Sequence, residues 1–277
     1  KGCRPDLKII VMSATLESGR LEAHLSPCCV VRSEGRTHPV EVSYSPGGAA
    51  RGKEVWDKVG SALRKGVLAK KLTGDILVFL PGAFEIRRTI DALKKMPELK
   101  GFDLRPLYGQ LPPREQDAAL LPGKSRKIVL ATNVAETSLT IPNIRYVVDT
   151  GLARVSRYNP RTHTQRLPIE AIAQSSAEQR TGRCGRVVDG TCIRLYEERD
   201  FLARPEFAQP EIQRANLAEV ILRMIDLNFG DIERFPFIDP PQKGAIAGGF
   251  QLLHALGAID DNKQLTDRGR DMARLPI

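Results

Sequence analysis

The sequence predicts an α/β protein in which a buried parallel sheet is followed by a smaller, mainly helical segment. Two observations lead to this prediction. Short β-branched apolar runs alternate with longer amphipathic segments over most of the chain, a pattern typical of βαβ units. From about residue 205 the strand-like runs stop and helical periodicity takes over, with apolar side chains at Ile212, Leu217, Val220, Ile221, Met224 and Ile225.

The strand-like runs are short and mostly apolar, as expected for strands that are buried on both faces. They occupy residues 7–12, 40–44, 75–80, 103–108, 127–132, 146–150 and 191–196. Between them, residues 54–70, 83–96 and 113–121 predict the crossover helices. A Gly-rich stretch at residues 45–52 predicts a loop before the first of these helices.

A β-hairpin is predicted over residues 152–172, where the turn Asn159-Pro160-Arg161-Thr162 is flanked by alternating apolar and basic residues. It is either a wedge beside a nucleic-acid channel or a plain surface hairpin. Beyond it, two helices separated by the Pro-rich residues 235–241, then a turn and a short helix, suit a domain of winged-helix size. Because the strand at 7–12 has no partner strands upstream, we expect a fragment of a longer protein.

Charge and composition restrict the class of protein. The 277 residues include 42 Lys and Arg against 33 Asp and Glu, a net charge of +9 that favours a polyanionic partner such as nucleic acid. The sequence contains no apolar run of membrane-spanning length and no signal peptide, so we expect a cytoplasmic protein without a membrane partner. Five cysteines without a CxxC pair, and four scattered histidines, predict a reducing compartment and no metal site.

Two polar segments directly follow predicted strands. Ser13 and Thr15 close the first strand, where their hydroxyls either act at the carboxyl edge of the sheet or cap the next helix. Residues 132–140 follow a later strand, at the edge where open α/β sheets hold ligands, and their hydroxyl and amide groups suit phosphate and ribose oxygens. A polar loop with a capping Thr and Glu is the plainer alternative.

An arginine-rich segment, residues 179–186, places Arg183 and Arg186 three positions apart, on one face if the segment is helical. Two guanidinium groups held in this way can neutralise a transferring phosphoryl group, with Gln179 orienting the attacking water. The alternative is a solvated arginine face that pairs with Glu178. Two glycines cost a helix about 1 kcal/mol each relative to Ala, which argues for a role beyond solubility.

Two stretches imitate a phosphate-binding loop without completing it. Residues 47–53 have the GxxxxGK spacing, but Glu54 stands where a Ser or Thr must bind Mg²⁺. Gly123-Lys124-Ser125 has the correct ending, but Ala118 takes the place of the first glycine. We therefore expect a loop at the first stretch and a turn at the second.

Six segments in this order resemble the motifs of superfamily 2 DEAH-box RNA helicases. They are MSAT (12–15), FLPG (79–82), LYGQLPPREQ (107–116), ATNVAETSLTIP (131–142), YVVDTG (146–151) and QRTGRCGR (179–186). The continuation GTCIRLYEERDFLARPEFAQPEI most resembles the bacterial HrpA-type members. The resemblance implies the end of a first RecA-like domain at residues 1–35, a second RecA-like domain at 36–204 and the start of a winged-helix domain at 205–277.

The resemblance also implies an activity. Members of the family use ATP and Mg²⁺ to move along single-stranded RNA and to unwind duplexes, and we expect a monomer that acts on RNA, alone or in a ribosome or other ribonucleoprotein. The family's phosphate-binding loop and DEAH motif belong to its first domain, so the isolated chain is expected not to hydrolyse ATP. Two rivals stay open: a non-catalytic nucleic-acid-binding module that uses residues 154–186, and a DNA translocase of the same superfamily.

Individual roles follow from the same resemblance. Arg183 and Arg186 resemble the arginine fingers, and Gln179 resembles the residue near the γ-phosphate and the lytic water. The other implied site residues are Thr140 and Leu120 for the nucleotide, Gly82, Thr132, Asn133, Ser138, Arg157 and Arg161 for RNA, and Ser13 and Thr15 for coupling between domains. Leu120 stands where many relatives stack an aromatic ring on adenine, and Pro142 where many carry an acidic residue, so we expect looser contacts to base and ribose.

Overall fold

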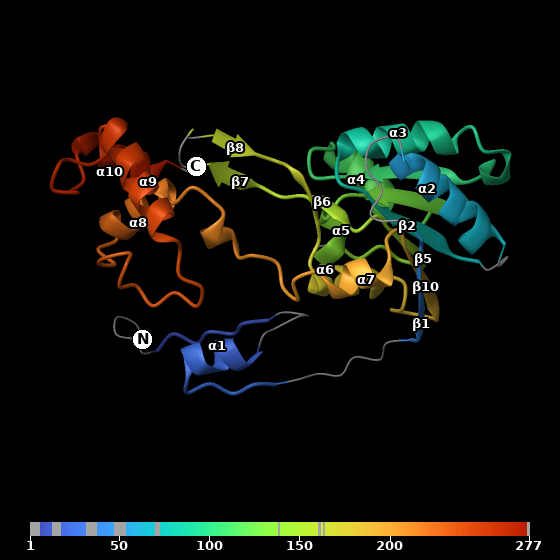
Figure 1. Ribbon diagram of the computed structural model, residues 1–277, viewed down its shortest axis with the longest axis horizontal. Coiled ribbons are helices and arrows are strands. Elements are labelled where there is room, and N and C mark those ends of the chain that lie inside the picture. Colours follow the sequence, from blue (N-terminus) through green and yellow to red (C-terminus); the bar gives the residue numbers. More distant parts are fainter. Residues whose placement is uncertain are drawn as a thin grey trace.

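The computed structural model describes residues 6–12, 18–31, 38–46, 54–69, 73–137, 139–159, 162 and 164–275. Its centre is a six-stranded sheet in the order β1-β10-β5-β2-β4-β3, with every neighbouring pair parallel (Figure 1). The strands are β1 (Val40–Tyr44), β2 (Asp75–Phe79), β3 (Asp103–Leu107), β4 (Lys127–Ala131), β5 (Ile144–Asp149) and β10 (Gly190–Arg194). The predicted α/β class with a parallel sheet is confirmed.

Helices cover both faces of this sheet. They are α2 (Glu54–Ala62), continued by a π-helical stretch (Leu63–Leu68), α3 (Ala83–Leu93), α4 (Pro113–Leu120), α5 (Val134–Thr137), α6 (Gln174–Thr181) and α7 (Glu198–Leu202). Figure 1 shows α2 and α3 side by side above the strands. A short 3-10 turn (Pro97–Leu99) leads from α3 into β3.

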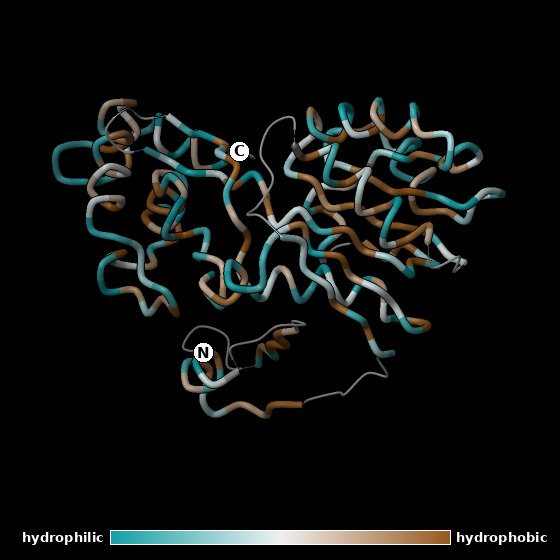
Figure 2. Tube along the Cα trace, turned by 45° about the vertical axis from the view of Figure 1, so that its right-hand side comes forward, coloured by the Kyte–Doolittle hydropathy of each residue, from teal (hydrophilic) through white to brown (hydrophobic). Residues whose placement is uncertain are grey.

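Successive residues of β2 show how the two faces are filled. Ile76 and Val78 pack in the cluster that contains the apolar side chains of α2 and α3. Leu77 and Phe79 point to the other face, where α4 and α5 contribute buried alanines. Both faces of the strand are therefore dry, which explains why its sequence is an uninterrupted apolar run, and Figure 2 shows the hydrophobic positions concentrated along the strands.

The predicted strand at residues 7–12 is wrong. These residues have no strand geometry and are exposed, with Met12 at 86% of its full accessibility, and they lead towards the short helix α1 (Ser18–Leu25). A strand is stable only when a neighbour pairs with its backbone. In the described part of the chain no strand pairs with this run, so its apolar sequence alone does not produce a strand.

The predicted hairpin consists of two antiparallel ladders. β6 (Leu152–Arg154) pairs with β9 (Ile169–Ala171), and further out β7 (Arg157–Asn159) pairs with β8 (Thr164–Arg166). The outer ladder extends from the sheet towards the C-terminal helices (Figure 1), where the Tyr158 amide donates to the Arg214 carbonyl at 2.9 Å. The hairpin thus connects the sheet with the last part of the chain.

The C-terminal segment has a hydrophobic core of its own. A 3-10 turn (Glu211–Gln213) precedes α8 (Ala218–Asp226), α9 (Lys243–Ala255) and α10 (Asp267–Arg274). Ile221 of α8 and Leu253 of α9 are each 1% exposed within this core. Gly249 permits the close approach of the two helices, because a Cβ there would lie 2.6 Å from the Ile221 Cδ1 atom. No helix among the described residues combines the length and apolar character needed to cross a bilayer.

We expect Leu77→Ala to lower the free energy of unfolding by about 2–5 kcal/mol, because it removes a fully buried side chain from the central strand and leaves a cavity. The measurement is urea unfolding followed by circular dichroism. Leu121→Ala is the matched control, since Leu121 is 62% exposed and its loss should change the free energy by less than about 0.5 kcal/mol. Equal effects of both substitutions would contradict this core assignment.

Candidate nucleotide and nucleic-acid site

Four chain segments meet at the carboxyl edge of the sheet. The loop at residues 132–141 follows β4, the hairpin follows β5, helix α6 precedes the arginine-rich turn, and residues 195–204 follow β10. Parallel strands place their carboxyl ends at one edge, which is where open α/β sheets bind ligands. Contacts between α6 and both α5 and β5 bring the arginines of residues 180–186 to the 132–141 loop.

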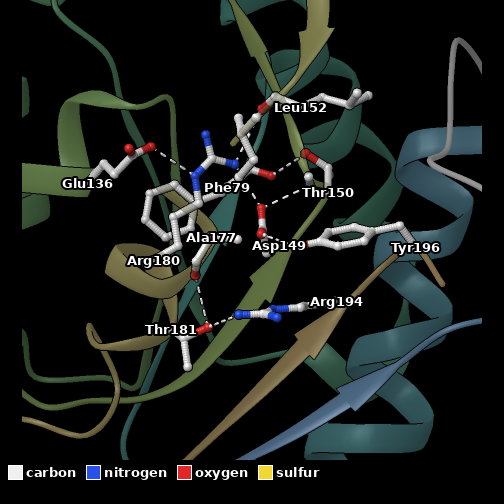
Figure 3. Close-up of polar contacts among 12 residues, drawn as sticks. Phe79, Glu136, Asp149, Thr150, Leu152, Ala177, Arg180, Thr181, Arg194 and Tyr196 are labelled. Carbon is white, nitrogen blue, oxygen red and sulfur yellow. Dashed lines mark hydrogen bonds and ion pairs between the residues drawn. The ribbon is translucent and has the colours of Figure 1, made fainter. Parts of the chain in front are cut away.

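Arg180 is fully buried and forms the centre of this edge (Figure 3). Its Nη1 donates to Asp149 Oδ1 at 2.7 Å and to the Leu152 carbonyl at 3.3 Å, and its Nε donates to Glu136 Oε2 at 3.0 Å. The guanidinium carbon also lies 4.7 Å from the centre of the Phe79 ring. Burial acts to lower the pKa of Arg180, but the charges of Asp149 and Glu136 outweigh it and the pKa is raised, so Arg180 is a permanent cation.

Asp149 is the second fully buried charge at this edge. Its Oδ1 also accepts from the Gly151 amide at 2.9 Å, and its Oδ2 accepts from the Tyr196 hydroxyl at 3.0 Å. Burial and the nearby Asp149 carboxylate raise the pKa of Tyr196, which keeps its hydroxyl protonated and donating. Gly151 has a φ of +71°, and a Cβ there would lie 2.4 Å from the Tyr196 Cε1 atom, so the turn into the hairpin requires glycine.

Arg183 binds the backbone of the 132–141 loop. Its Nε donates to the Glu136 carbonyl at 2.9 Å, its Nη1 donates to the Leu139 carbonyl at 2.6 Å, and its Nη2 also donates to the Glu136 carbonyl. Burial and the neighbouring Arg186 charge lower the pKa of Arg183 to about 10, although Glu136 acts in the opposite direction. Arg183 is therefore still charged at neutral pH, and its donors face the loop.

Arg186 lies in a different environment, because it is exposed and its Nη1 donates to the Thr140 hydroxyl at 3.2 Å. The helical arrangement considered for Arg183 and Arg186 is wrong: α6 ends at Thr181, and residues 182–188 form turns and bends. Gly185 explains the departure, because its carbonyl accepts from the His38 amide at 2.9 Å and a Cβ would lie 2.8 Å from the His38 carbonyl oxygen. This glycine serves a close approach of two backbone segments.

The other predicted nucleotide residues are spread between the two edges of the sheet, and Leu120 lies at the amino edge, where Lys127 at the start of β4 donates to the Ala119 and Leu121 carbonyls. Gln179 is half-buried on α6, next to Arg180. Thr140 contacts Arg186, as described above, whereas Leu120 is half-buried and packs against the core cluster beneath α4 and α5. The roles of Gln179, Thr140 and Leu120 towards a nucleotide stay predictions.

The predicted RNA residues are only partly accessible. Asn133 is exposed and Thr132 is half-buried with its amide donating to the Leu107 carbonyl at 3.1 Å. Gly82 is buried at the start of α3, where a Cβ would lie 2.5 Å from the Arg154 Nε. In the hairpin, Arg157 forms two hydrogen bonds with Glu170, at 2.7 and 3.0 Å. Ser13, Thr15, Ser138 and Arg161 lie outside the described residues. The RNA-binding and domain-coupling roles stay predictions.

Sequence reasoning missed three buried arginines, of which Arg180 is one. Arg194, 1% exposed, donates to the Tyr44 hydroxyl at 2.7 Å, to Glu178 Oε1 at 2.8 Å and to the Thr181 hydroxyl at 3.1 Å. Arg204 lies over the Tyr196 ring at 3.9 Å. Arg194 had a signal in the sequence, since it is the one charged residue in the run at 191–196. Arg180 had none that separates it from the exposed arginines beside it.

Among the described residues no group of three or more His, Cys, Asp or Glu side chains is arranged to hold a metal ion. Beside the amino ends of β1 and β10, Arg186 and Thr140 instead present a cation and a hydroxyl. Such a donor set suits an anionic ligand, and phosphate in particular.

Two parts of the chain match known families. Residues 58–188 match the helicase conserved C-terminal domain, and residues 250–277 match the winged-helix helicase-associated (HA2) domain. The sheet with arginines at its carboxyl edge is therefore that of a helicase C-terminal domain, a RecA-like fold, followed by a winged-helix segment.

Whole-chain relatives refine this assignment. The chain is 50% identical to the ATP-dependent RNA helicase HrpA of Escherichia coli strain K12, over 99% of this chain and 22% of that protein, and 47% identical to the HrpA homologue of Haemophilus influenzae, over 99% and 21%. A crystal structure of the E. coli DEAH/RHA helicase HrpB is similar with a TM-score of 0.86 and 36% identity, covering 98% of this chain and 34% of that one. The chain spans about a fifth of the length of these HrpA relatives and is similar to them over nearly its whole own length.

Thiol reactivity provides a test of this packing. Burial raises the pKa of both Cys184 and Cys192 to about 12, so at pH 8 only about one thiol in 10⁴ is the reactive thiolate. We expect iodoacetamide to modify the exposed Cys28 and Cys29 first and to reach Cys184 and Cys192 only after unfolding. Peptide mass spectrometry at pH 8, with and without guanidinium chloride, measures this order. Rapid modification of Cys184 in the folded protein would contradict the arrangement.

Proposed function

We propose that this chain forms one half of the motor of an ATP-dependent RNA helicase. In the full-length protein, ATP and Mg²⁺ lie between a preceding RecA-like domain and the surface that carries Arg186 and Thr140. Residues 1–35 are then the end of that first domain, 36–204 the second RecA-like domain and 205–277 the start of the winged-helix domain. The observation that carries the proposal is that one arginine of the motif is exposed beside Thr140 while its two neighbours hold the 132–141 loop.

Mechanistically, the bound ATP supplies the phosphoanhydride that is cleaved. Arg186 is free to extend towards solvent because it has one long hydrogen bond, and its guanidinium is suited to neutralise the charge that develops on the transferred phosphoryl group. Arg183 keeps the loop in place and needs only a local rearrangement to approach the same group. Gln179 is assigned the role of orienting the water that attacks the γ-phosphate, as the family resemblance implies.

RNA is proposed to lie along the carboxyl edge of the sheet. Thr132, Asn133 and Ser138 contact its backbone, with Gly82 beside them, and the hairpin at 152–172 meets the duplex through its basic residues. Movement of the two RecA-like domains against each other then shifts the strand and opens the duplex. We expect a cytoplasmic, monomeric enzyme acting on RNA alone or in a ribosome or other ribonucleoprotein.

We expect the isolated 277-residue chain to show no ATP hydrolysis, because neither of its two loop-like stretches completes a phosphate-binding loop. The full-length protein should hydrolyse ATP, and single-stranded RNA should accelerate it. The measurement is phosphate release with and without RNA, using a DNA strand of the same sequence as control. A full-length protein that binds RNA but never hydrolyses ATP would point to a binding module, and equal stimulation by DNA would point to a DNA translocase.

Arg186→Ala in the full-length protein should lower RNA-stimulated turnover by about 10³-fold or more, the effect typical of an arginine finger. Its thermal unfolding midpoint should not change, because the side chain is exposed. Arg183→Ala should lower both turnover and the midpoint, since it leaves two carbonyl groups of the loop without their donor.

Arg223→Ala is the matched control for both arginine substitutions, because Arg223 lies in an exposed ion pair with Glu219 on α8. This control should leave turnover and midpoint near the wild-type values. Wild-type turnover in the Arg186→Ala protein would remove Arg186 from the reaction.

A further inference from the structure

Arg180 contacts neither ATP nor RNA in the mechanism proposed above, although it lies in the same motif as Arg183 and Arg186. It has no exposed surface, and it cannot reach a nucleotide or RNA unless the edge opens. Its three hydrogen-bond partners come from three different segments: the carboxylate of Glu136 in α5, the carboxylate of Asp149 at the end of β5, and the carbonyl of Leu152 at the start of the hairpin (Figure 3).

These contacts connect the loop with the hairpin through a rigid group. The guanidinium is a planar fork, so Nε and Nη1 keep a fixed spacing and cannot move independently. A displacement of Glu136 therefore turns or shifts the group that also holds Asp149 and Leu152. A lysine at this position would have one ammonium in place of the fork and could not hold both carboxylates in the same way.

Both ends of the hairpin are fixed to the same cluster. Asp149 accepts from the Gly151 amide, one residue before the hairpin begins, and the Gly151 carbonyl accepts from the Ile172 amide at 3.0 Å. Arg204 adds a bond to the Gly151 carbonyl at 3.1 Å and one to the Ile172 carbonyl at 3.4 Å. The base of the hairpin thus moves with Asp149 and Arg180 as one unit.

The loop side of the cluster has two separate attachments. Arg183 holds the main-chain carbonyls of Glu136 and Leu139, whereas Arg180 holds the Glu136 side chain. The side-chain link can therefore be removed without removing the main-chain link. In addition, Arg180 Nη2 is buried and has no partner among the described residues, so the guanidinium keeps one donor that a shifted loop or hairpin can use.

We propose that Arg180 is the positioning residue that transmits movement of the 132–141 loop to the base of the hairpin, and so couples ATP hydrolysis to strand separation. The inference rests on the proposed function, since it assigns a task to a residue of the same motor. A purely structural ion pair would stabilise the edge and no more. A coupling residue and a purely structural ion pair differ in one measurable quantity, the number of base pairs unwound per ATP hydrolysed. Only loss of the coupling residue should lower it.

The test uses the full-length protein and measures base pairs unwound per ATP hydrolysed. This ratio does not depend on the fraction of active enzyme, because misfolded molecules drop out of both quantities. We expect Arg180→Lys and Glu136→Gln each to lower the ratio about fivefold or more, in the range typical of coupling between sites. The Arg180→Lys/Glu136→Gln double variant should be no worse than the more affected single variant, because both remove the same link.

Glu219→Gln is the matched control, since it removes a carboxylate from an exposed ion pair with Arg223 at 3.0 Å and should leave the ratio unchanged. If Arg180→Lys does not fold, Glu136→Gln alone decides. An unchanged ratio in Glu136→Gln would overturn the coupling role while leaving the helicase function intact. A wild-type protein that neither hydrolyses ATP with RNA nor unwinds a duplex would instead overturn the proposed function.

Discussion

The buried ion pair between Arg180 and Asp149 is the interaction on which the carboxyl edge depends. Both side chains are fully buried and 2.7 Å apart, so each charge is acceptable in the interior only because the other is present. Glu136, Tyr196 and the Gly151 amide satisfy further bonding capacity of the pair. Because these partners come from separate segments, the pair also determines where loop, strand end and hairpin meet.

The three arginines of the motif differ in accessibility, and this difference divides their tasks. Arg180 is fully enclosed by charged and aromatic partners, Arg183 is largely buried against loop carbonyls, and Arg186 is exposed beside a hydroxyl. The same side chain therefore has three environments: Arg180 is buried between two carboxylates, Arg183 binds carbonyls of the loop, and Arg186 is an exposed cation. The chain leaves α6 after Thr181, and Gly185 then meets His38 just before β1, so Arg186 lies beside the amino end of β1 and not at the carboxyl edge where Arg180 is buried.

Much of the fold could be predicted from the sequence, because a strand buried on both faces must be apolar throughout. The central strands β2, β4 and β5 follow such runs, and the 132–140 loop follows β4 as predicted. The contact of Arg183 with this loop was not predicted. The run at 7–12 is similarly apolar but has no paired strand in the described structure. The composition of a segment does not show whether another strand pairs with it. For the same reason the exposed and buried arginines of one motif could not be told apart.

The buried charges also determine how the base of the hairpin is held. A hairpin that only covered the surface could attach through apolar contacts at its base. Here the base is held by Arg204 on the Gly151 and Ile172 carbonyls and by Asp149 on the Gly151 amide. Hydrogen bonds to buried charges are directional and cannot slide as apolar contacts can. The hairpin therefore keeps a fixed orientation relative to the arginine motif, which is what transmission of a small displacement at the edge requires.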